Sequence, residues 1–544
     1  MQCRAYGLAR NTGRNGDRTI TSSENNTIAA IDLGSNSFHM VVAEEQNGEL
    51  VVLDRIREMV RLGEGLDDDG NLDSEVEQRA LDCLSRFGQR IRSLSQRCVS
   101  TVGTNTLRRT NNAAEFLRHA EEALGFPIEI ISGVEEARLI YQGVAHTLEQ
   151  DERRNLIVDI GGGSTELIIG EGFTPQLMHS LEMGCVMISK KFFADGKIKE
   201  KSLQAARIYV LQRMKSVHYL YRRKGWDVAI GSSGSIKSIA SVIQQMALQE
   251  GEGISRSALT RLLAICSDYK TIDSLDLPGL SERRRPVFIG GLVVLAGVFE
   301  SLGIEQMQFS QGALREGLLY DMLGRRYNRD IRNSSIESLS RRFHTDQAHV
   351  ERVTLTAFDF FQQLKPFWFR KNKLHAKNLL RWACESHEIG RDISHSAYQV
   401  HGAYIIQNAD LAGFSRQEQY RVAAIIHSHR GKILKDNYKQ ESHKKLRQML
   451  IRLTIVLRLS VIFHRSRVEN ALPMIELSAD KTSITLRIPD QWLEEHPLTI
   501  NDLENEANYL ANIGISLHTE RTPSAGQHIT NCSPPDLPVT SPGQ

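Results

Sequence analysis

Apolar and polar positions alternate along the chain in two ways, which separate an α/β part from a helical part. Up to about residue 325, short apolar runs typical of strands alternate with amphipathic stretches typical of helices. The clearest helical stretch repeats apolar residues on one face, at Val76, Ala80, Leu84, Phe87, Ile91 and Leu94. Ser74 with Glu77 predicts a capping box at its start. The alternation predicts α/β structure with a mixed sheet.

The pattern changes near residue 326. Amphipathic stretches then follow one another up to about residue 470, which predicts an all-helical region. Segment 474–493 predicts a small β hairpin. Both ends of the chain, residues 1–26 and 519–544, are polar, and the second is rich in Pro, Ser, Thr and Gly, so we expect disordered tails there.

An internal repeat relates two predicted strand pairs. Segments 29–44 and 157–171 align with a shift of 127 residues, which places Asp32 on Asp159, Gly34 on Gly161 and Ser37 on Ser164. Each segment consists of a strand, a loop of acid, glycine and hydroxyl residues, and a second strand. This period is far too long for a solenoid, and it fits two related α/β lobes that face each other across a cleft.

The repeated loops combine groups that attract phosphate with groups that repel it. Glycines let backbone N–H groups approach phosphate oxygens, and the hydroxyls of Ser35, Ser37, Ser164 and Thr165 add donors. The carboxylates of Asp32, Asp159 and Glu166 would repel an anion. A Mg²⁺ ion resolves the conflict, because it binds carboxylate and phosphate oxygens together. The loops therefore predict a Mg²⁺-phosphate clamp, and a plain hairpin turn would not need these acids.

A third glycine-rich loop follows a predicted strand and opens a predicted helix. It contains Gly231, Ser233, Gly234 and Ser235. Free backbone amides and the helix dipole favour an anion at such a junction.

Two acids open another predicted helix directly after a strand. Ser132 is a candidate N-cap, and Glu135, three residues later, is its candidate reciprocal partner. Glu136 is left without a local role, and it lies on the edge where α/β proteins place ligands. We favour Glu136 over Glu135 as a general base that takes a proton from an attacking water.

Polar residues also end the predicted strand before residue 104. Thr104, Asn105 and Arg108 are candidates for the same cleft. Arg108 could hold phosphate oxygens through two parallel bonds, or it could pair with a nearby acid, and the sequence favours neither alternative.

Composition restricts the class of protein. A chain of 544 residues is too long for one core. The best candidate for a membrane span, residues 290–299, is shorter than the roughly 18 residues that span a bilayer. Seven scattered cysteines argue against a disulfide framework and a zinc site, and the N-terminus lacks the apolar core of a secretory signal, so we expect a cytoplasmic protein.

Charge is distributed unevenly. The formal net charge is only +2, yet residues 326–470 contain 26 Lys and Arg against 13 Asp and Glu. Solvated helix faces and a surface for a polyanion, such as nucleic acid or a long phosphate chain, explain this excess equally well. The sequence contains no P-loop, GxSxG, kinase or dinucleotide motif.

The motifs together resemble the exopolyphosphatase and guanosine pentaphosphate phosphohydrolase family. The resemblance extends from about Ile28 to about Leu517. It rests on DLGSNSFHMVV, VGTNTLRR, ISGVEEARLIYQGV, DIGGGSTELIIG, MGC, GSSGSIKS and QGALREGLLYDML. It implies two actin-like, ribonuclease-H-like α/β lobes, then an all-α domain like the HD hydrolases and a small C-terminal α+β domain. It also implies Mg²⁺-dependent hydrolysis of a terminal phosphoanhydride bond.

The resemblance also places functional residues and boundaries. The phosphate and metal loops fall on residues 32–37, which include Asn36, and on residues 159–166, which include Gly162 and Gly163; the catalytic glutamate falls in the pair Glu135–Glu136. The domains become a tail at 1–26, lobe I at 27–148, lobe II at 149–325, a helical domain at 326–470, a C-terminal domain at 471–518 and a tail at 519–544.

In the helical domain, His349 and His387 lie near the positions expected for an HD hydrolase. Glu388 follows where that superfamily has aspartate. This departure argues against an independent metal-hydrolase site there and for a domain that supports binding.

Within the family, the sequence favours exopolyphosphatase. The basic helical region suits a long polyphosphate chain, and the unbroken glycines 161–163 favour the same member. Hydrolysis of guanosine pentaphosphate (pppGpp), or both activities, is the alternative. A sugar-kinase-like phosphotransferase and a nucleotide-binding scaffold are more distant alternatives on the same fold. The resemblance also implies a homodimer, and we expect no specific nucleic acid as partner.

Overall fold

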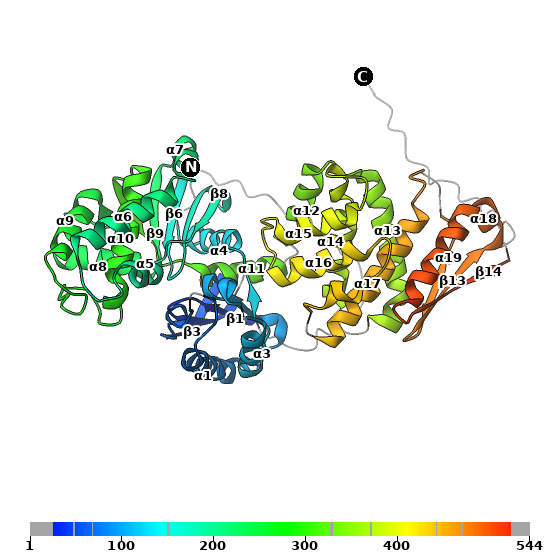
Figure 1. Ribbon diagram of the computed structural model, residues 1–544, viewed down its shortest axis with the longest axis horizontal. Coiled ribbons are helices and arrows are strands. Elements are labelled where there is room, and N and C mark those ends of the chain that lie inside the picture. Colours follow the sequence, from blue (N-terminus) through cyan, green and yellow to red (C-terminus); the bar gives the residue numbers. More distant parts are fainter. Residues whose placement is uncertain are drawn as a thin grey trace, which may run out of the picture.

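The computed structural model describes most of the chain in one elongated molecule (Figure 1). The described residues are 26–46, 49–67, 69–111, 113–148, 153–326, 330–369, 373–441, 443–468 and 472–523. Two α/β lobes lie at one end, and a helical region followed by a small sheet lies at the other (Figure 1). The predicted tails lie outside the described residues, except for residue 26 and residues 519–523.

Lobe I contains a five-stranded mixed sheet of order β3-β2-β1-β4-β5. Its strands are β1 (Thr27–Leu33), β2 (Phe38–Gln46), β3 (Glu49–Glu58), β4 (Val99–Gly103) and β5 (Glu129–Ile130). Helices α1 (Ser74–Ile91) and α3 (Ala113–Leu124) pack on one face. The predicted cap of α1 is wrong by one residue: Asp73 is the N-cap and accepts hydrogen bonds from the backbone N–H groups of Glu75 and Val76.

Lobe II contains a six-stranded mixed sheet of order β10-β11-β9-β6-β7-β8. Its strands are β6 (Arg154–Ile160), β7 (Thr165–Glu171), β8 (Thr174–Leu181), β9 (Val228–Ser232), β10 (Ile254–Ser255) and β11 (Gln306–Phe309). Its helices are α5 (Cys185–Phe192), α6 (Glu200–Met214), α7 (His218–Lys224), α8 (Ser233–Gln245), α9 (Arg256–Ser267) and α10 (Arg285–Leu302). These helices bury the outer face of the sheet.

The two lobes share a topology that matches the sequence repeat. In each, two antiparallel hairpins precede a strand that pairs in parallel with the first strand, which is β1 with β4 in lobe I and β6 with β9 in lobe II. The predicted mixed sheets are therefore confirmed. Asp32 and Asp159 occupy the same position near the ends of β1 and β6.

Two helices, α4 (Gly133–Ala145) and α11 (Leu314–Arg326), lie between the sheets and bury the inner face of each. They cross closely because glycines meet there: a Cβ on Gly317 would lie 1.8 Å from the Leu139 carbonyl oxygen. Arg138 of α4 forms a buried ion pair with Asp321 of α11, Nη2 to Oδ1 2.6 Å. This helix pair fixes how the lobes face each other.

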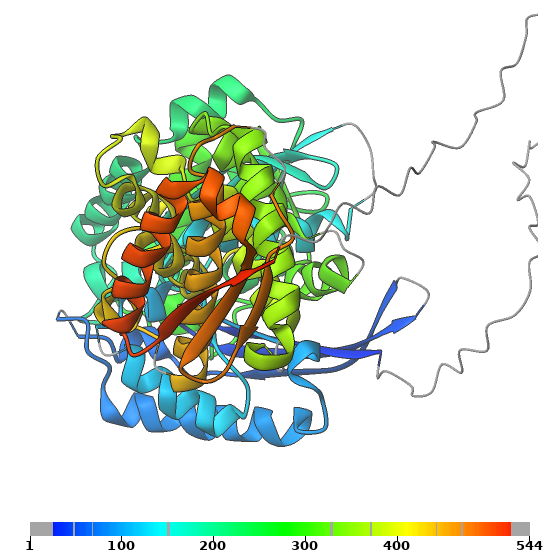
Figure 2. The ribbon, with the colours of Figure 1, turned by 90° about the vertical axis from the view of Figure 1, so that its right-hand side faces the viewer.

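The helical region and the small sheet share one apolar core. Its helices are α12 (Ile331–Arg342), α13 (Gln347–Trp368), α14 (Lys373–Ser386), α15 (Tyr398–Asn408), α16 (Arg416–Ser428) and α17 (Lys444–Phe463). The predicted hairpin is present as β12 (Glu476–Ala479) and β13 (Ser483–Pro489), followed by α18 (Asp490–Glu495) and α19 (Pro497–Ala511). Figure 2 views the molecule from this end.

The small sheet extends further than the sequence predicted. Strand β14 (Ser516–Thr522) pairs in parallel with β13, so residues 519–522 belong to a sheet and the expected disordered tail is wrong there. The polar composition of this segment hid the strand, because only Leu517 of β14 reaches toward the core.

The helical region docks on lobe I through backbone contacts. Ile131 forms a β-bridge with Ser415, and the side chain of Gln417 bonds the backbone on both sides, accepting from Ile130 N–H (3.0 Å) and donating to the Ile128 carbonyl (3.3 Å). The Gly413 N–H also donates to Glu135 Oε2, 2.7 Å away. Helix α4 is therefore held from lobe II and from the helical region.

Helix α10 is long and apolar enough to cross a membrane, although the apolar run inside it looked too short in the sequence. Its most apolar stretch is 72% buried among the other helices and the sheet of lobe II. It is a core helix of this lobe.

We predict that Gly317→Ala destabilises the protein by about 1–3 kcal/mol, because the new Cβ overlaps the backbone of α4. The midpoint of urea unfolding measures this loss. Gly402→Ala is the matched control, since its Cβ would lie 3.3 Å from a movable side-chain methyl of Ile426 and a helix gains from alanine. Equal midpoints for Gly317→Ala and the unchanged protein would contradict the account of the crossing.

Candidate active site

A cleft of about 330 Å³ opens between the lobes, and both repeated loops line it. We name residues 34–37 the first loop, residues 161–164 the second loop and residues 231–235 the third loop. In the first loop, a Cβ on Gly34 would lie 3.0 Å from the Ser37 carbonyl oxygen, and in the second a Cβ on Gly161 would lie 3.2 Å from that of Ser164. The two loops therefore fold into the same tight turn.

The glycines of the second loop allow the two lobes to touch. A Cβ on Gly162 would lie 2.9 Å from Ser35 Cβ, and one on Gly163 would lie 2.1 Å from Asn105 Oδ1. Neither glycine has positive φ, so the backbone conformation does not require glycine at these positions. The close approach of the two lobes does. The first and second loops thus face each other across one cleft.

Two carboxylates also line the cleft, those of the buried Asp159 and of the partly buried Asp32. Burial raises the pKa of Asp32 to about 7, and the nearby Glu136 and Asp159 add to the rise against the lowering effect of Arg315. Burial likewise raises the pKa of Asp159 to about 7. Asp32 Oδ1 is buried without a hydrogen-bond partner among the described residues. This oxygen and the opposing carboxylate fit a divalent cation.

The third predicted metal ligand, Glu166, lies next to Asp159 but is not part of the cleft lining. Its side chain is buried in the sheet, where its Oε1 accepts a hydrogen bond from Ser180 Oγ at 2.8 Å, and it does not line the cleft. Burial and the charge of Glu136 raise its pKa well above the usual range. Glu166 pairs with Asp159 across β6 and β7, so the two side chains share one face of the sheet, and its role as a metal ligand stays a prediction.

Helix α4 separates the two candidate glutamates. Ser132 is the N-cap, as predicted, and accepts from the Glu135 N–H. The Glu135 carboxylate does not return this bond: both of its oxygens accept from Arg138, at 2.7 and 2.8 Å. Glu136, one residue later, lines the cleft. The structure therefore gives Glu135 a buried ion pair and Glu136 access to a ligand.

Arg108 fills the second of its two proposed roles. Its Nη1 donates to Glu136 Oε2 at 2.8 Å and to the Ile131 carbonyl at 3.0 Å, and the residue is not part of the cleft lining. Arg108 thus orients the Glu136 carboxylate, and direct phosphate binding by Arg108 is not supported.

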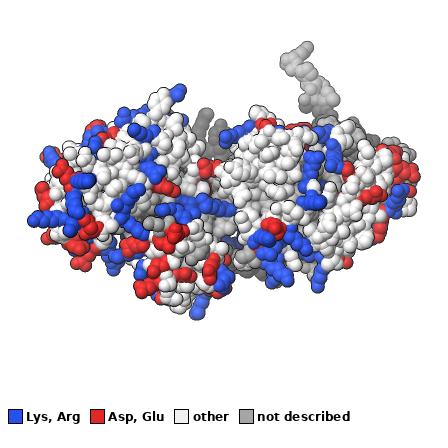
Figure 3. All heavy atoms as spheres, in the orientation of Figure 1, with Lys and Arg blue, Asp and Glu red and all other residues white. Residues whose placement is uncertain are grey.

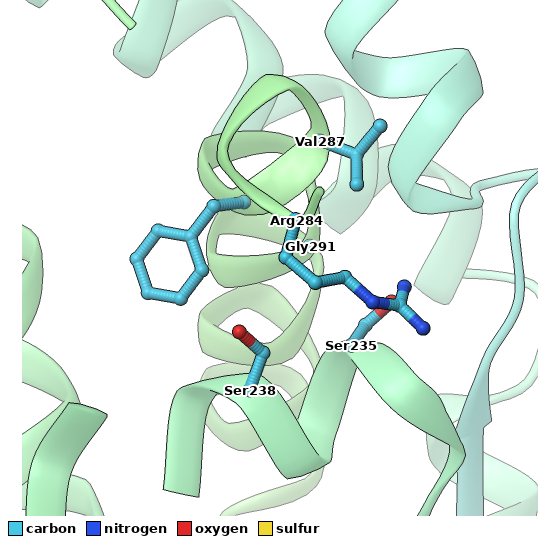
Figure 4. A pocket seen from close by; sticks show the side chains of 6 residues that line it. Ser235, Ser238, Arg284, Val287 and Gly291 are labelled. Atoms are coloured by element: carbon cyan, nitrogen blue, oxygen red, sulfur yellow. The ribbon is translucent and has the colours of Figure 1, made fainter. Parts of the chain in front are cut away.

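The third loop lies at a strand-to-helix junction, as predicted, because β9 ends at Ser232 and α8 begins at Ser233. Ser233 has φ of 84° and a buried hydroxyl without a partner in the described part of the chain. Arg284 reaches from the start of α10 toward Ser235 (Figure 4). Free backbone N–H groups and the helix dipole at the start of α8 favour an anion there.

Most predicted phosphate-binding residues line the cleft. These are Gly34, Ser35, Asn36, Ser37, Thr104, Asn105, Gly161, Gly162, Gly163, Ser164, Ser233, Gly234 and Ser235. Thr165 and Gly231 do not line it: Thr165 is fully buried with its hydroxyl donating to the Met183 carbonyl, and Gly231 packs against Ile236 and Met307.

Five basic residues line the cleft that the sequence analysis did not single out. They are Arg55, Arg57, Lys237, Arg284 and Arg315. They come from β3, α8, the N-cap of α10 and α11, which are far apart in the sequence, so only the fold gathers them. On the face drawn in Figure 3, Lys and Arg atoms also cross the region around α11 between the lobes.

His39 was missed as well, although the repeat pointed to it, because it occupies the position of Glu166 shifted by 127 residues. Arg315 Nη1 lies 2.6 Å from His39 Nδ1, and Ser37 Oγ lies 2.8 Å from His39 Nε2. Arginine can only donate, so Nδ1 accepts and Nε2–H donates to Ser37. The Ser37 hydroxyl proton is then directed to another acceptor, which the cleft can supply.

Comparison with known proteins identifies relatives along nearly the whole chain. The model described as the Ppx/GppA phosphatase family matches residues 41–326, and the model described as Ppx/GppA phosphatase, domain III, matches residues 331–507. A guanosine-5'-triphosphate,3'-diphosphate pyrophosphatase from Aeromonas hydrophila is 37% identical over 486 residues, which cover 89% of this chain and 97% of that protein.

A solved structure shows the same lobes. The exopolyphosphatase of Cytophaga hutchinsonii superposes with a TM-score of 0.50 at 24% identity, covering 55% of this chain and 97% of that one. This likeness shows the fold alone, and with the family match it establishes two actin-like lobes in this chain.

We predict that His39 stays neutral, with its proton on Nε2, between about pH 6 and 8. Burial, followed by repulsion from Arg315 and Arg57, lowers its pKa well below the usual value. Arg315→Met removes one repulsive charge, so the pKa should rise. Histidine ¹⁵N NMR, assigned with His39→Gln, measures both effects. A protonated His39 at pH 6 in the unchanged protein would refute the tautomer argument.

Proposed function

This chain belongs to the Ppx/GppA phosphatase family, whose members hydrolyse phosphoanhydride bonds, and on that premise we propose that it is an exopolyphosphatase. It removes the terminal phosphate of inorganic polyphosphate as orthophosphate, remains on the shortened chain and repeats the step. One observation carries the proposal: a single cleft combines two facing glycine-hydroxyl loops, the carboxylate of Glu136 and five basic side chains.

Different residues of the cleft perform different parts of the hydrolysis of the terminal phosphate. Backbone amides and hydroxyls of the first and second loops, together with the start of α8, receive the oxygens of the terminal phosphoryl group. Glu136 accepts the proton of the water that attacks phosphorus in line with the bridging oxygen. The bridging P–O bond breaks, and the shorter polyphosphate leaves as an anion held by the basic residues. Arg108 keeps Glu136 oriented.

Mg²⁺ fits the acidic part of the cleft, and Asp32 and Asp159 are the residues that would hold it. When bound, the ion neutralises negative charge on the phosphate oxygens and lowers the repulsion between substrate and carboxylates. Glu166 is not part of the cleft lining, so Asp32 and Asp159 are the ligands that we propose.

The basic residues favour a long substrate. A polyphosphate carries negative charge on every unit, so positive charge is needed beyond the terminal group. The basic side chains of the cleft supply it. Arg416 of the basic helical region lies close enough to Arg108 for their repulsion to contribute, after burial, to the lowered pKa of Arg416. Arg416 therefore brings part of the basic helical region near the arginine that contacts Glu136, and this region can extend the binding path.

Hydrolysis of pppGpp is the second candidate, and the Aeromonas relative favours it. That protein bears the name of this activity and aligns along 97% of its length. Both reactions cleave a terminal phosphoanhydride, so one cleft can perform both. We also infer a cytoplasmic location, consistent with five described cysteines that form no disulfide, and a homodimer, which light scattering would test.

We predict that Glu136→Gln keeps the fold and polyphosphate binding but lowers turnover by roughly 10²–10⁴, the range of general-base catalysis. Glu135→Gln should instead lower thermal stability, because it weakens the buried pair with Arg138, and it should retain turnover per folded molecule. The exposed Glu122→Gln is the control for lost charge. Initial rates of phosphate release measure turnover, and near-normal turnover in Glu136→Gln would reject this residue as the base.

Substrate preference is tested by phosphate release from long polyphosphate and from pppGpp, each with and without Mg²⁺. We expect Mg²⁺-dependent release that is faster from polyphosphate. Replacing Arg416, Lys444 and Lys445 with glutamine should raise KM about tenfold for long chains and leave pppGpp unaffected, because only a long chain reaches the helical region. Lys201→Gln on lobe II is the control. Equal effects on both substrates would contradict the extended path, and faster release from pppGpp would make it the main substrate.

A further inference from the structure

A row of three polar side chains crosses the sheet of lobe I on the side of the cleft. Strand pairing places His39 of β2 opposite Asp32 of β1 and, on its other side, opposite Arg57 of β3. The side chains of directly paired residues share one face of a sheet, and all three residues line the cleft. His39 therefore lies in the middle of this row, and the proposed hydrolysis gives it no task.

Arg315 determines which nitrogen of His39 carries the proton. Its Nη1 lies 2.6 Å from His39 Nδ1, and a guanidinium can only donate a hydrogen bond. Nδ1 therefore accepts, and the ring keeps its single proton on Nε2. A second proton on Nδ1 would point at the N–H groups of the guanidinium, so this geometry fits only the neutral ring.

The proton on Nε2 in turn determines the direction of the Ser37 hydroxyl. Ser37 Oγ lies 2.8 Å from His39 Nε2, so it accepts this bond and keeps its own proton for another group. Asp32 Oδ1 has no hydrogen-bond partner among the described residues, so it does not take this proton. Ser37 is only 7% exposed and lines the cleft. A ligand in the cleft is the acceptor that remains.

The equivalent serine of lobe II has a different neighbour. Ser164 corresponds to Ser37 in the repeat, and Glu166 corresponds to His39. A glutamate side chain has no N–H group to donate, and Glu166 Oε1 accepts from Ser180 Oγ at 2.8 Å. Of the first and second loops, only the first is therefore held by a nitrogen donor, which makes Ser164 an internal reference for Ser37.

We propose that His39 is a positioning residue that holds the Ser37 hydroxyl as a hydrogen-bond donor to an oxygen of the terminal phosphoryl group. Arg315 keeps His39 in the tautomer that this role requires. The inference rests on the proposed function and deepens it, because it identifies one hydroxyl of the cleft whose direction is fixed before the substrate binds. A donor that is oriented in advance stabilises the charge of the transition state without reorganisation.

A double-variant cycle tests whether His39 acts through Ser37. We expect Ser37→Ala to lower kcat by roughly 10²-fold, the loss typical of one preorganised donor. His39→Leu should lower kcat by roughly tenfold, because a hydroxyl that is no longer held is misplaced part of the time. The protein with both substitutions should match Ser37→Ala alone. His39→Gln should keep most of the activity, since its amide can also donate to Ser37 Oγ.

Ser164→Ala is the matched control, because Ser164 lines the same cleft in the equivalent loop but has no nitrogen donor beside it. Its effect and that of His39→Leu should multiply. Turnover is measured per folded molecule, as phosphate release from polyphosphate and from pppGpp. Calorimetric binding of orthophosphate repeats the cycle without turnover. Absence of phosphate release from both substrates would reject the proposed function alone, and the binding cycle would still decide the role of His39.

Three results would overturn the proposal. The effects of His39→Leu and Ser37→Ala could multiply as those of an independent pair do. His39→Leu could lower the unfolding temperature and leave turnover per folded molecule and orthophosphate affinity unchanged, which is the result of a purely structural role. His39→Gln could be as impaired as His39→Leu. If His39→Leu does not fold, His39→Met replaces it in the cycle, since it is also apolar and less bulky near the backbone.

Discussion

The active site depends on one constraint: several carboxylates lie close together in the same cleft. Asp32 and Asp159 lie near the ends of related strands in the two lobes, and Glu136 lies near both, so the arrangement of the lobes brings like charges together in a poorly solvated space. Such groups remain ionised only if cations lie beside them. The chain supplies Arg315 and Arg108, and a bound divalent ion would complete the compensation. The acids that we propose as metal ligands are thus the ones whose mutual repulsion destabilises the cleft.

Helix α4 shows how two adjacent glutamates acquire different tasks. Successive residues of a helix point about 100° apart. Glu135 consequently faces Arg138 and the Gly413 N–H of the helical region, while Glu136 faces the cleft. The buried network around Arg138 continues to Asp321 on α11. It ties the orientation of the cleft carboxylate to both lobes and to the helical region, so the site is positioned by three parts of the chain at once.

Much of the site could be predicted from the sequence because it belongs to a repeat. The 127-residue shift identified the first and second loops, and the structure places both on one cleft in the same turn. The repeat did not show that equivalent positions can diverge: His39 lines the cleft, whereas its counterpart Glu166 is buried beside Ser180. Local spacing also failed where side chains compete, as with Asp73, which caps α1 in place of Ser74.

By itself, the sequence determined the α/β lobes, the helical region and the paired loops, because periodicity and glycine spacing are local properties that survive without tertiary contacts. Only the tertiary structure decided which side chains meet. It assigned Arg108 to Glu136, gathered Arg57, Lys237, Arg284 and Arg315 from separate elements, and placed His39 between Arg315 and Ser37. Charges and lone pairs interact over a few ångströms in space. The number of residues between two side chains in the sequence does not show whether they come that close.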